Sequence, residues 1–391
     1  QEADLVIAVT ASDETNILCC MTARAMGCAH TIARVRNTEY AEQLIMLKDT
    51  LGLSMTLNPE LSAAREIFNA LQFPSFLSRE TFARGRVEIV SLAIHKGNPL
   101  IGKKLYELPT DSKLKVLICA VERGDDVYIP SGNFIIEEGD KIHVTAEAHT
   151  LASLIKYLGI ENTRLRDVVL VGGSRIAAHL AKMLIAVGIG VTIIEIDPER
   201  CAELANMLPK ASIINADISD HGVMEEEIHG KADAAVFLLG IDEANLVMSL
   251  QASKLGMKKV VVKVDRMEYD TISDIIHDET IISPKLHSSN SILRYVRAMS
   301  NARSMDYIRA VYRLVNNKAE ALELSVPFDA PYLDNTLAEL PFRKNVLIAC
   351  IRRGSRILFP RGTDSINAGD TIIAFTTAEH HISQFRDLFE R

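Results

Sequence analysis

A short segment near the middle of the chain has the residue types and spacing of a phosphate-binding turn. Residues 165–188 read LRDVVLVGGSRIAAHLAKMLIAVG, an apolar run that passes through a glycine turn into a helical pattern. Against the pattern G-x-G-x-x-G/A, Gly172 takes the tight-turn position and Ala177 the helix-packing position. Ser174 stands where a middle glycine normally lets the backbone approach a pyrophosphate. The start of the following helix still offers free N–H groups and a positive dipole end to a phosphate.

A carboxylate follows at the place where such a turn needs one. Glu195 ends the second apolar run of this region. A carboxylate there accepts hydrogen bonds from both ribose hydroxyls and repels a 2′-phosphate, which favours NAD or ATP over NADP. Arg175 and Arg200 are further candidates for pairing with a phosphate. The alternative interpretation is a sheet of the same kind that has lost its ligand.

Polar residues also follow the later apolar runs. Asp217, after the third run, can reach an adenine amino group or cap the next helix. Asp242 and Asn245 follow the fourth run, where the ligand crevice of an open α/β sheet lies, and capping is again the alternative. Lys263 and Arg34 each end a fifth strand of their unit. We expect them to contact a phosphate or another subunit; an ordinary surface charge is the alternative.

The sequence offers no constellation for catalysis. A dehydrogenase needs a proton donor beside the nicotinamide, usually on a separate substrate domain, whereas the histidines here are scattered. The sequence contains no nucleophile elbow, Walker lysine motif or zinc-ligand spacing. We therefore predict that the chain is not an enzyme and has no metal site. The alternatives are an NAD-dependent oxidoreductase and a scaffold without a ligand.

Composition sets the broad class of the chain. Its 391 residues are 48 % apolar, which is enough for packed cores. The formal net charge of −8 argues against a dedicated nucleic-acid binder. The sequence has no run of the roughly 18 apolar residues that a membrane span needs. If the protein acts at a membrane, it needs a partner there.

The chain is an incomplete tandem repeat. Residues 3–27, ADLVIAVTASDETNILCCMTARAMG, match residues 232–256, ADAAVFLLGIDEANLVMSLQASKLG. A second pair of blocks matches as well: VERGDDVYIPSGNFIIEEGDKIHV starts at Val121, and IRRGSRILFPRGTDSINAGDTIIA at Ile351. Each unit thus has an N-lobe followed by a C-lobe. The glycine turn of the second unit has no counterpart in the first, so either the chain is a fragment or its first N-lobe is naturally incomplete. We expect a fragment, because the exposed edge of a parallel sheet would otherwise be a liability.

Four domains follow from the repeat. We predict an incomplete first N-lobe containing only its second half at 1–85, a first C-lobe at 86–161, a second N-lobe at 165–300 and a second C-lobe at 310–391. In the second N-lobe, short apolar runs without alternation fit strands buried on both faces, at 168–172, 191–194, 212–214, 234–239 and 260–264. Helical segments separate most of them, which predicts a doubly wound parallel sheet.

The C-lobes have a different pattern. Their short alternating runs are split by glycine and proline turns, as at 115–121 and 141–145. A helical pattern follows at 150–158 in the first C-lobe and at 379–389 in the second. These features predict two small α+β domains, joined to the N-lobes by helices over 62–71 and 290–298.

Together, these residues resemble the potassium-conductance-regulating family of tandem RCK (also called KTN) domains. In the N-lobes the resemblance lies in the GGSRIA turn, in Glu195 of IIEIDPER, in Asp217 of NADISD, and in the repeated D-E-x-N at 13–16 and 242–245. In the C-lobes it lies in RGDDVYIPSGNFIIEEGDKI and RGSRILFPRGTDSINAGDTI. The resemblance covers nearly the whole chain.

The resemblance implies a fold and a function. The fold would be tandem Rossmann-like doubly wound parallel sheets, each followed by a small α+β RCK C-terminal domain. The function would be that of a cytosolic regulatory ring that binds NAD(H), and ATP or ADP, beneath a potassium-channel membrane subunit of the TrkH type, on the inner face of the cell membrane. Such a ring is a homo-oligomer, either a dimer or a tetramer-like assembly, and binds no nucleic acid.

The family's binding residues carry over to particular positions. The pyrophosphate would lie on the turn formed by Gly172, Gly173, Ser174, Arg175 and Ile176, with Glu195 on the ribose. Lys263 and Arg34 match a position that is commonly arginine in the family. Val9 and Thr10 end a strand of the first unit and would line its site. The first unit lacks a glycine turn and acidic residue, so we do not expect normal nucleotide binding there.

Overall fold

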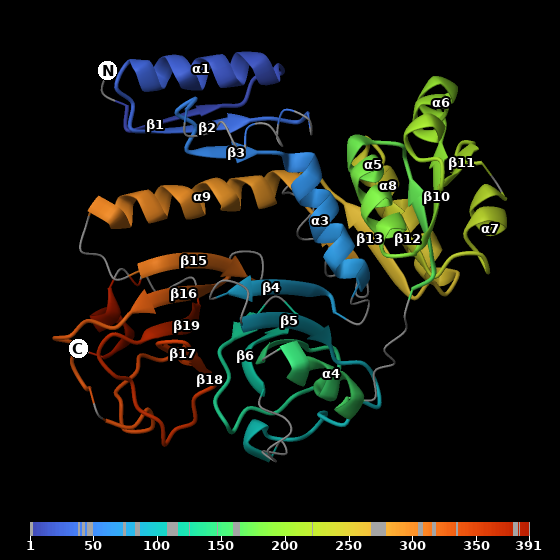
Figure 1. Ribbon diagram of the computed structural model, residues 1–391. Helices are drawn as coiled ribbons and strands as arrows, with labels where there is room; N and C mark the ends of the chain where they lie inside the picture. The colour runs from blue at the N-terminus through green and yellow to red at the C-terminus, as the bar shows by residue number, and fades with distance from the viewer. Residues whose placement is uncertain are drawn as a thin grey trace. The chain divides into compact units, whose positions relative to one another are not determined.

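The computed structural model describes most of the chain, and Figure 1 shows its course. The described residues are 3–37, 40, 44, 50–72, 76–82, 87–107, 116–124, 126–146, 148–158, 165–220, 222–266, 279–303, 308–314, 318–333, 335–377, 382 and 384–390. The chain divides into two compact units. The first combines Gln1–Phe68, Arg166–Met267 and Ile281–Ser289, and the second combines Asn69–Leu165, Glu268–Thr280 and Asn290–Arg391. The N-lobe sheets thus lie in the first unit and the C-lobe sheets in the second.

The second N-lobe contains a six-stranded sheet in the order β11-β10-β9-β12-β13-β14, and β9 to β13 pair in parallel. The two central strands, β9 and β12, are apolar and almost wholly buried, as the lack of alternation predicts. The sequence-predicted strands are confirmed, and β14 is an additional one. The strands are β9 (Asp167–Val171), β10 (Gly190–Glu195), β11 (Ser212–Asn215), β12 (Ala234–Phe237), β13 (Lys259–Lys263) and β14 (Thr280–Ile282).

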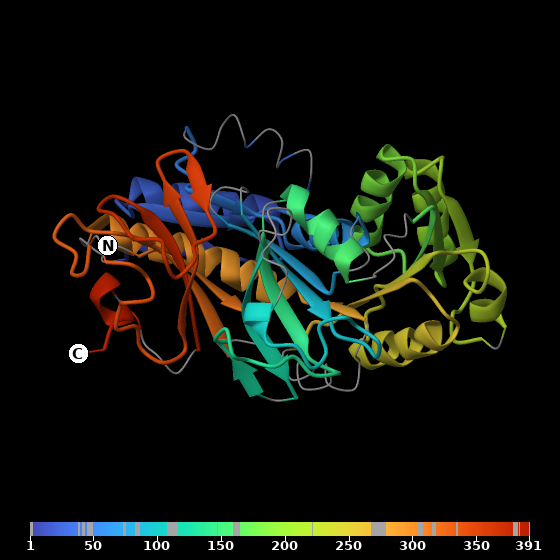
Figure 2. The same cartoon turned by 90° about the horizontal axis from the view of Figure 1, so that it is seen from below.

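Helices connect these parallel strands. Helices α5 and α6 lie on one face of the sheet and α8 on the other (Figure 2). The strand order reverses between β9 and β12, so the crevice at the carboxyl ends of these two strands is the expected ligand position. The helices are α5 (Arg175–Ala186), α6 (Pro198–Met207), α7 (Val223–Glu227) and α8 (Asp242–Lys254).

The first N-lobe repeats the second half of this arrangement. Its parallel strands β1 (Leu5–Ala8), β2 (His30–Arg34) and β3 (Met55–Leu57) correspond to β12, β13 and β14. Helix α1 (Asp13–Ala25) covers one face of this sheet, as Figure 1 shows. Two long helices then leave the N-lobes where linking helices are predicted: α3 (Pro59–Gln72) and α9 (Pro284–Arg303).

Both C-lobes contain a five-stranded antiparallel sheet of one topology, in the orders β4-β5-β8-β6-β7 and β15-β16-β19-β17-β18. The elements of the first C-lobe are β4 (Ser78–Phe82), β5 (Val87–Ala93), η1 (Leu105–Glu107), β6 (Val116–Arg123), β7 (Asp126–Tyr128), β8 (Lys141–Ala146) and α4 (Ala148–Tyr157). Those of the second are β15 (Ile308–Leu314), β16 (Ala319–Ser325), β17 (Val346–Arg353), β18 (Arg356–Leu358), β19 (Thr371–Thr377) and η3 (Phe385–Leu388). The fold class predicted from the sequence is confirmed.

One local prediction in the second C-lobe is wrong. The helix predicted over 379–389 is, in its described part, only the short 3-10 helix η3, whose Phe385 and Leu388 are buried. Residues 378–381 and 383 lie outside the described residues. The ring of Phe389 instead stacks on Phe342 at 5.2 Å and lies against Tyr332 at 5.1 Å. Aromatic packing, rather than the helix that the periodicity predicted, therefore positions Phe389.

Candidate functional site

The glycine turn begins where β9 ends, and its first residue must be glycine. Gly172 has φ +97°, and a Cβ atom there would lie 3.1 Å from the Leu238 carbonyl oxygen. Its N–H donates to the carbonyl of Ile194 at 2.8 Å, which fixes the turn between β9, β10 and β12. A side chain would thus meet both an unfavourable backbone conformation and a neighbouring backbone atom.

Glu195 and the glycine turn contact each other directly. Glu195 Oε2 accepts a hydrogen bond from the Gly173 N–H at 2.5 Å, and Oε1 accepts one from Asp197 N–H at 2.9 Å. A Cβ atom at Gly173 would lie 2.9 Å from Glu195 Oε2 and 2.6 Å from Leu204 Cδ1. The structure therefore brings together the two parts of the site that the sequence placed on separate strands.

Ser174, the departure from the glycine pattern, starts α5. Its φ of −62° and ψ of 169° suit any residue, and its Oγ accepts a hydrogen bond from Ala177 N–H at 3.3 Å. The serine thus gives the helix an N-cap where the family pattern has glycine.

We expect Ser174→Ala to lower the free energy of unfolding by about 1 kcal/mol, because Ala177 N–H then loses its partner. Ser174→Gly should lower the free energy of unfolding by only roughly 0.3 kcal/mol. Urea denaturation followed by circular dichroism measures both changes. Equal losses for the two variants would contradict the capping role of the hydroxyl.

The other residues of the turn have separate tasks. The side chain of Ile176 is buried in the core. Arg200 Nε donates to the Gly173 carbonyl at 2.7 Å, and its Nη1 lies 2.7 Å from Glu203 Oε2. Arg200 therefore braces the turn from α6, a role that its distance in sequence did not reveal.

Asp242 and Asn245 are buried and bond to backbone. The side chain of Asn245 accepts from Leu239 N–H at 2.8 Å and donates to the carbonyls of Leu239 at 3.1 Å and Lys263 at 3.0 Å. Asp242 Oδ2 accepts the N–H groups of Asp265 and Arg266, each at 3.0 Å. The pair joins the carboxyl ends of β12 and β13, and thereby shapes the edge of the crevice.

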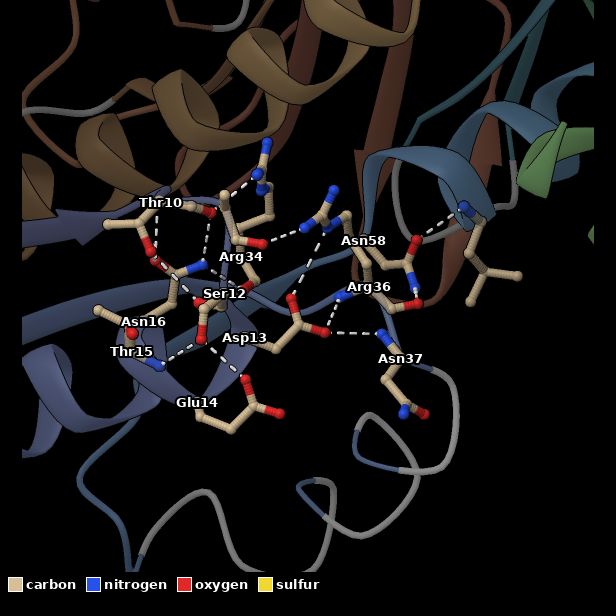
Figure 3. A network of polar contacts seen from close by, with 12 residues as sticks. Thr10, Ser12, Asp13, Glu14, Thr15, Asn16, Arg34, Arg36, Asn37 and Asn58 are labelled. Atoms are coloured by element: carbon tan, nitrogen blue, oxygen red, sulfur yellow. Dashed lines mark hydrogen bonds and ion pairs between the residues drawn. The ribbon is translucent and has the colours of Figure 1, made fainter.

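Figure 3 shows the same network in the first N-lobe. Asn16 accepts from Thr10 N–H at 2.7 Å and donates to the Arg34 carbonyl at 2.9 Å, while Asp13 Oδ2 accepts the N–H groups of Arg36 and Asn37 at 2.8 Å. Arg34 Nη2 donates to the Thr10 carbonyl at 2.7 Å. Val9, just before Thr10, is 54 % exposed. The repeated D-E-x-N motif was the signal for Asp13 and Asn16, which sequence reasoning had left out of the site.

Lys263 and Asp217 make local contacts. Lys263, the counterpart of Arg34, is buried and its Nζ lies 2.8 Å from Asp265 Oδ2. Asp217 Oδ1 accepts from Ser219 Oγ at 2.7 Å and Ser219 N–H at 2.9 Å, and these bonds lower the pKa of Asp217. Both side chains lie at or just after the end of a strand, and each already bonds to a residue two positions further along the chain.

A basic cavity adjoins the turn within the first compact unit. It has a volume of about 620 Å³, and its lining includes Arg36, Arg175, Lys182 and Arg200. His179 also lines it; burial lowers the pKa of His179, and the charge of Lys182 lowers it further. Among the described residues that line the cavity, the acidic ones are Asp13 and Glu14 and the basic ones are more numerous, so the cavity favours an anionic group.

The chain thus alternates two parallel N-lobe sheets with two antiparallel C-lobe sheets, and the second N-lobe has a glycine turn and a carboxylate at its strand ends. A family model described as the TrkA-N domain matches residues 1–59 and 168–284, and one described as the TrkA-C domain matches 89–159 and 321–390. The chain belongs to the TrkA family. In the described part of the chain, we find no helix with the length and apolarity of a membrane span.

Curated relatives and solved structures agree with this assignment. The chain is 29 % identical over 382 residues to the Trk system potassium uptake protein TrkA homolog 2 of Methanosarcina mazei, covering 96 % of this chain and 83 % of that protein. It is 28 % identical to TrkA of Haemophilus influenzae, covering 100 % of this chain and 85 % of that protein. Among structures, the GsuK channel matches with a TM-score of 0.58 at 18 % identity, over 96 % of this chain and 65 % of the channel chain. That match supports the fold.

Proposed function

We propose that this chain is a regulatory subunit that binds NAD(H), and ATP or ADP, on its second N-lobe and thereby controls potassium flux through a membrane partner. The observation that carries the proposal is the contact between Gly173 N–H and Glu195 at the carboxyl ends of β9 and β10. Two relationships support it: the curated relatives are named potassium uptake proteins, and one structure with the same fold is a GsuK channel bound to NAD.

The geometry of the turn suits an adenine dinucleotide or a nucleoside di- or triphosphate. Glu195 already accepts two N–H groups, and an ionised carboxylate has about four acceptor sites, so ribose hydroxyls can still bind it. A phosphate fits the first turn of α5, beside Arg175 and its positive dipole end. The exposed side chains of Ile196 and Ile241 offer apolar contact to a base. Asp217 is our candidate for its amino group.

Other predicted residues shape rather than form this site. We propose that Asp242 and Asn245 position the crevice edge, since their polar atoms bond to backbone. Lys263 Nζ can contact a phosphate only after its ion pair with Asp265 breaks. In the first N-lobe, Val9, Thr10 and Arg34 stand at the equivalent edge and would line that lobe's site, where we do not expect normal nucleotide binding.

Control of flux requires that nucleotides bind one state of the assembly better than another. We propose a cytoplasmic homo-oligomeric ring, a dimer or a tetramer-like assembly, bound to a TrkH-type membrane subunit. Potassium flux through that subunit, reconstituted with and without each nucleotide, measures the coupling. Steady turnover of a nicotinamide cofactor with small substrates would instead favour the oxidoreductase alternative.

We expect Glu195→Ala to weaken NADH and ATP binding by tenfold or more, because two charge-assisted hydrogen bonds of about 1.5–3 kcal/mol each are at stake. Isothermal titration calorimetry of the full chain measures the affinities. Glu199→Ala is the matched control: this exposed carboxylate lies in the first turn of α6, and its loss should leave both affinities unchanged. No heat with either nucleotide for the wild-type chain would overturn the proposal and favour a ligand-free scaffold.

A further inference from the structure

Gly173, the second residue of the glycine turn, is held through both of its peptide groups. Its N–H donates to Glu195 Oε2 at 2.5 Å, and its carbonyl accepts from Arg200 Nε at 2.7 Å. Both partners come from one short segment, since Glu195 ends β10 and Arg200 lies in the first turn of α6. A glycine has no Cβ atom to limit the rotation of its peptide groups, so these two bonds fix what the backbone alone leaves free.

The bond from Arg200 also determines where the next N–H group points. The peptide group between Gly173 and Ser174 is planar and trans, so its carbonyl and its N–H point in opposite directions. With the carbonyl directed at Arg200 on α6, the Ser174 N–H is directed away from α6. This N–H and those of Arg175 and Ile176 stand at the start of α5, and none of the three has an acceptor among the described residues.

Two nitrogen atoms of Arg200 already have protein partners. Its Nη1 lies 2.7 Å from Glu203 Oε2, one turn further along α6, and its Nε is bonded to Gly173. The Arg200 side chain is 25 % exposed, whereas Arg175 at the start of α5 is exposed. Arg175 is therefore the better candidate for direct contact with a phosphate, and the role of Arg200 lies in the turn.

The orientation of this peptide group decides whether the turn attracts or repels an anion. A flip of the peptide group between Gly173 and Ser174 would exchange the N–H for a carbonyl oxygen, whose partial negative charge repels a phosphate. Without the bond from Arg200, the flipped orientation loses its main penalty and becomes populated. Because a nucleotide binds only one of the two orientations, its apparent affinity falls by the fraction of chains in the other.

We propose that Arg200 is a positioning residue of the nucleotide site: by holding the Gly173 carbonyl, it keeps the Ser174 N–H available to a phosphate of the bound nucleotide. The inference rests on the function proposed above, since it requires a phosphate at the first turn of α5. It assigns the contribution of Arg200 to one hydrogen bond from Nε and not to the charge of the guanidinium group.

Two substitutions of similar size separate the hydrogen bond from the charge. In Arg200→Gln, the amide Nε2 can occupy the place of the arginine Nε and donate to Gly173, whereas Arg200→Met has no donor there. We expect Arg200→Met to weaken NADH and ATP binding about tenfold, and Arg200→Gln to restore most of that loss. Isothermal titration calorimetry of the full chain measures the affinities. Equal affinities of the two variants, whether both are reduced or both match the wild type, would overturn the proposal.

A second measurement needs no bound nucleotide. Labelling glycine carbonyls with ¹³C and serine amides with ¹⁵N selects Gly-Ser pairs in NMR spectra, and the sequence has two, Gly173-Ser174 and Gly354-Ser355. In the ligand-free chain, the Ser174 signal should shift or broaden in Arg200→Met and stay near its wild-type position in Arg200→Gln. The Ser355 signal is the internal control and should stay in place in both variants.

The two measurements distinguish this inference from the function on which it rests. An unchanged Ser174 signal in Arg200→Met would overturn the positioning role whatever the chain binds. If the Ser174 signal responds as expected but the wild-type chain gives no heat with NADH or ATP, the proposed function is contradicted, and the hold of Arg200 on the turn is not.

Discussion

Asp140→Ala should lower the free energy of unfolding of the C-lobe unit by about 3 kcal/mol, the low end of the range for breaking a buried ion pair. Asp140 is fully buried, and its carboxylate accepts from Arg123 Nε at 2.7 Å, Arg123 Nη2 at 2.8 Å and Glu137 N–H at 2.8 Å. The hydrogen bonds that Arg123 donates to Asp140 also raise the pKa of Arg123. Because the Arg123 side chain is 31 % exposed, water can partly solvate the guanidinium left behind. Urea denaturation measures the loss.

An exposed pair of the same chemistry is the matched control. Asp329 Oδ2 lies 3.6 Å from Arg386 Nη2, and both side chains are mostly exposed. Asp329→Ala should therefore change the free energy of unfolding by less than about 0.5 kcal/mol. Asp370→Ala should behave like Asp140→Ala, because Asp370 is buried and holds Arg353 Nη2 at 2.8 Å and Asn367 N–H at 2.9 Å. Similar losses for Asp140 and Asp329 would show that burial is not the cause.

These ion pairs show what a repeat can reveal in a sequence. Arg123 and Arg353, and Asp140 and Asp370, stand at matching places in the two C-lobe blocks, so their equivalence was visible in the sequence. Their pairing was not visible, because a segment that contains a further strand, β7 or β18, separates each arginine from its aspartate in sequence. Only the register of β6 against β8, in which Glu122 lies opposite Lys141, brings Arg123 beside the loop that ends at Asp140.

The parallel sheet was predictable because its strands are buried on both faces. β9 and β12 read as unbroken apolar runs, and no helix of ordinary length fits within them. β14 was not predicted, because it has only three residues, Thr280–Ile282. It is a strand because it pairs in the sheet, and its own sequence pattern does not indicate one. Local propensity is too weak to define so short an element.

The candidate site was predictable where a motif fixes backbone geometry. Gly172 and Glu195 could be placed because the tight turn and the second strand end are parts of one local unit. The sequence left the roles of Asp242 and Asn245 open between ligand contact and helix capping. The structure shows a third role, because both side chains form hydrogen bonds to backbone groups at strand ends. Both reach the end of the next strand, at Lys263 and Asp265, which are distant in sequence. No local pattern specifies such tertiary bonds.

Gly173→Ala should weaken NADH and ATP binding at least tenfold while costing about 1–3 kcal/mol of folding free energy, the range for overpacking. The added methyl group would lie 2.6 Å from Leu204 Cδ1 and 2.9 Å from Glu195 Oε2, so one of them must move. Movement of Glu195 breaks its 2.5 Å hydrogen bond to Gly173 N–H and takes the carboxylate away from the ribose position. Calorimetry with each nucleotide and urea denaturation measure the two effects separately.

Gly240→Ala separates this effect from a general loss of glycine near the site. Gly240 follows β12 at the same edge of the sheet, and a Cβ atom there would have no neighbour within 4 Å. Its substitution should leave both nucleotide affinities within about twofold of wild type, since no contact changes. If Gly173→Ala bound nucleotide as tightly as Gly240→Ala, close approach of the turn to Glu195 would not be what prepares the site. The carboxylate would then have to act on the ligand, if at all, from a position independent of the turn.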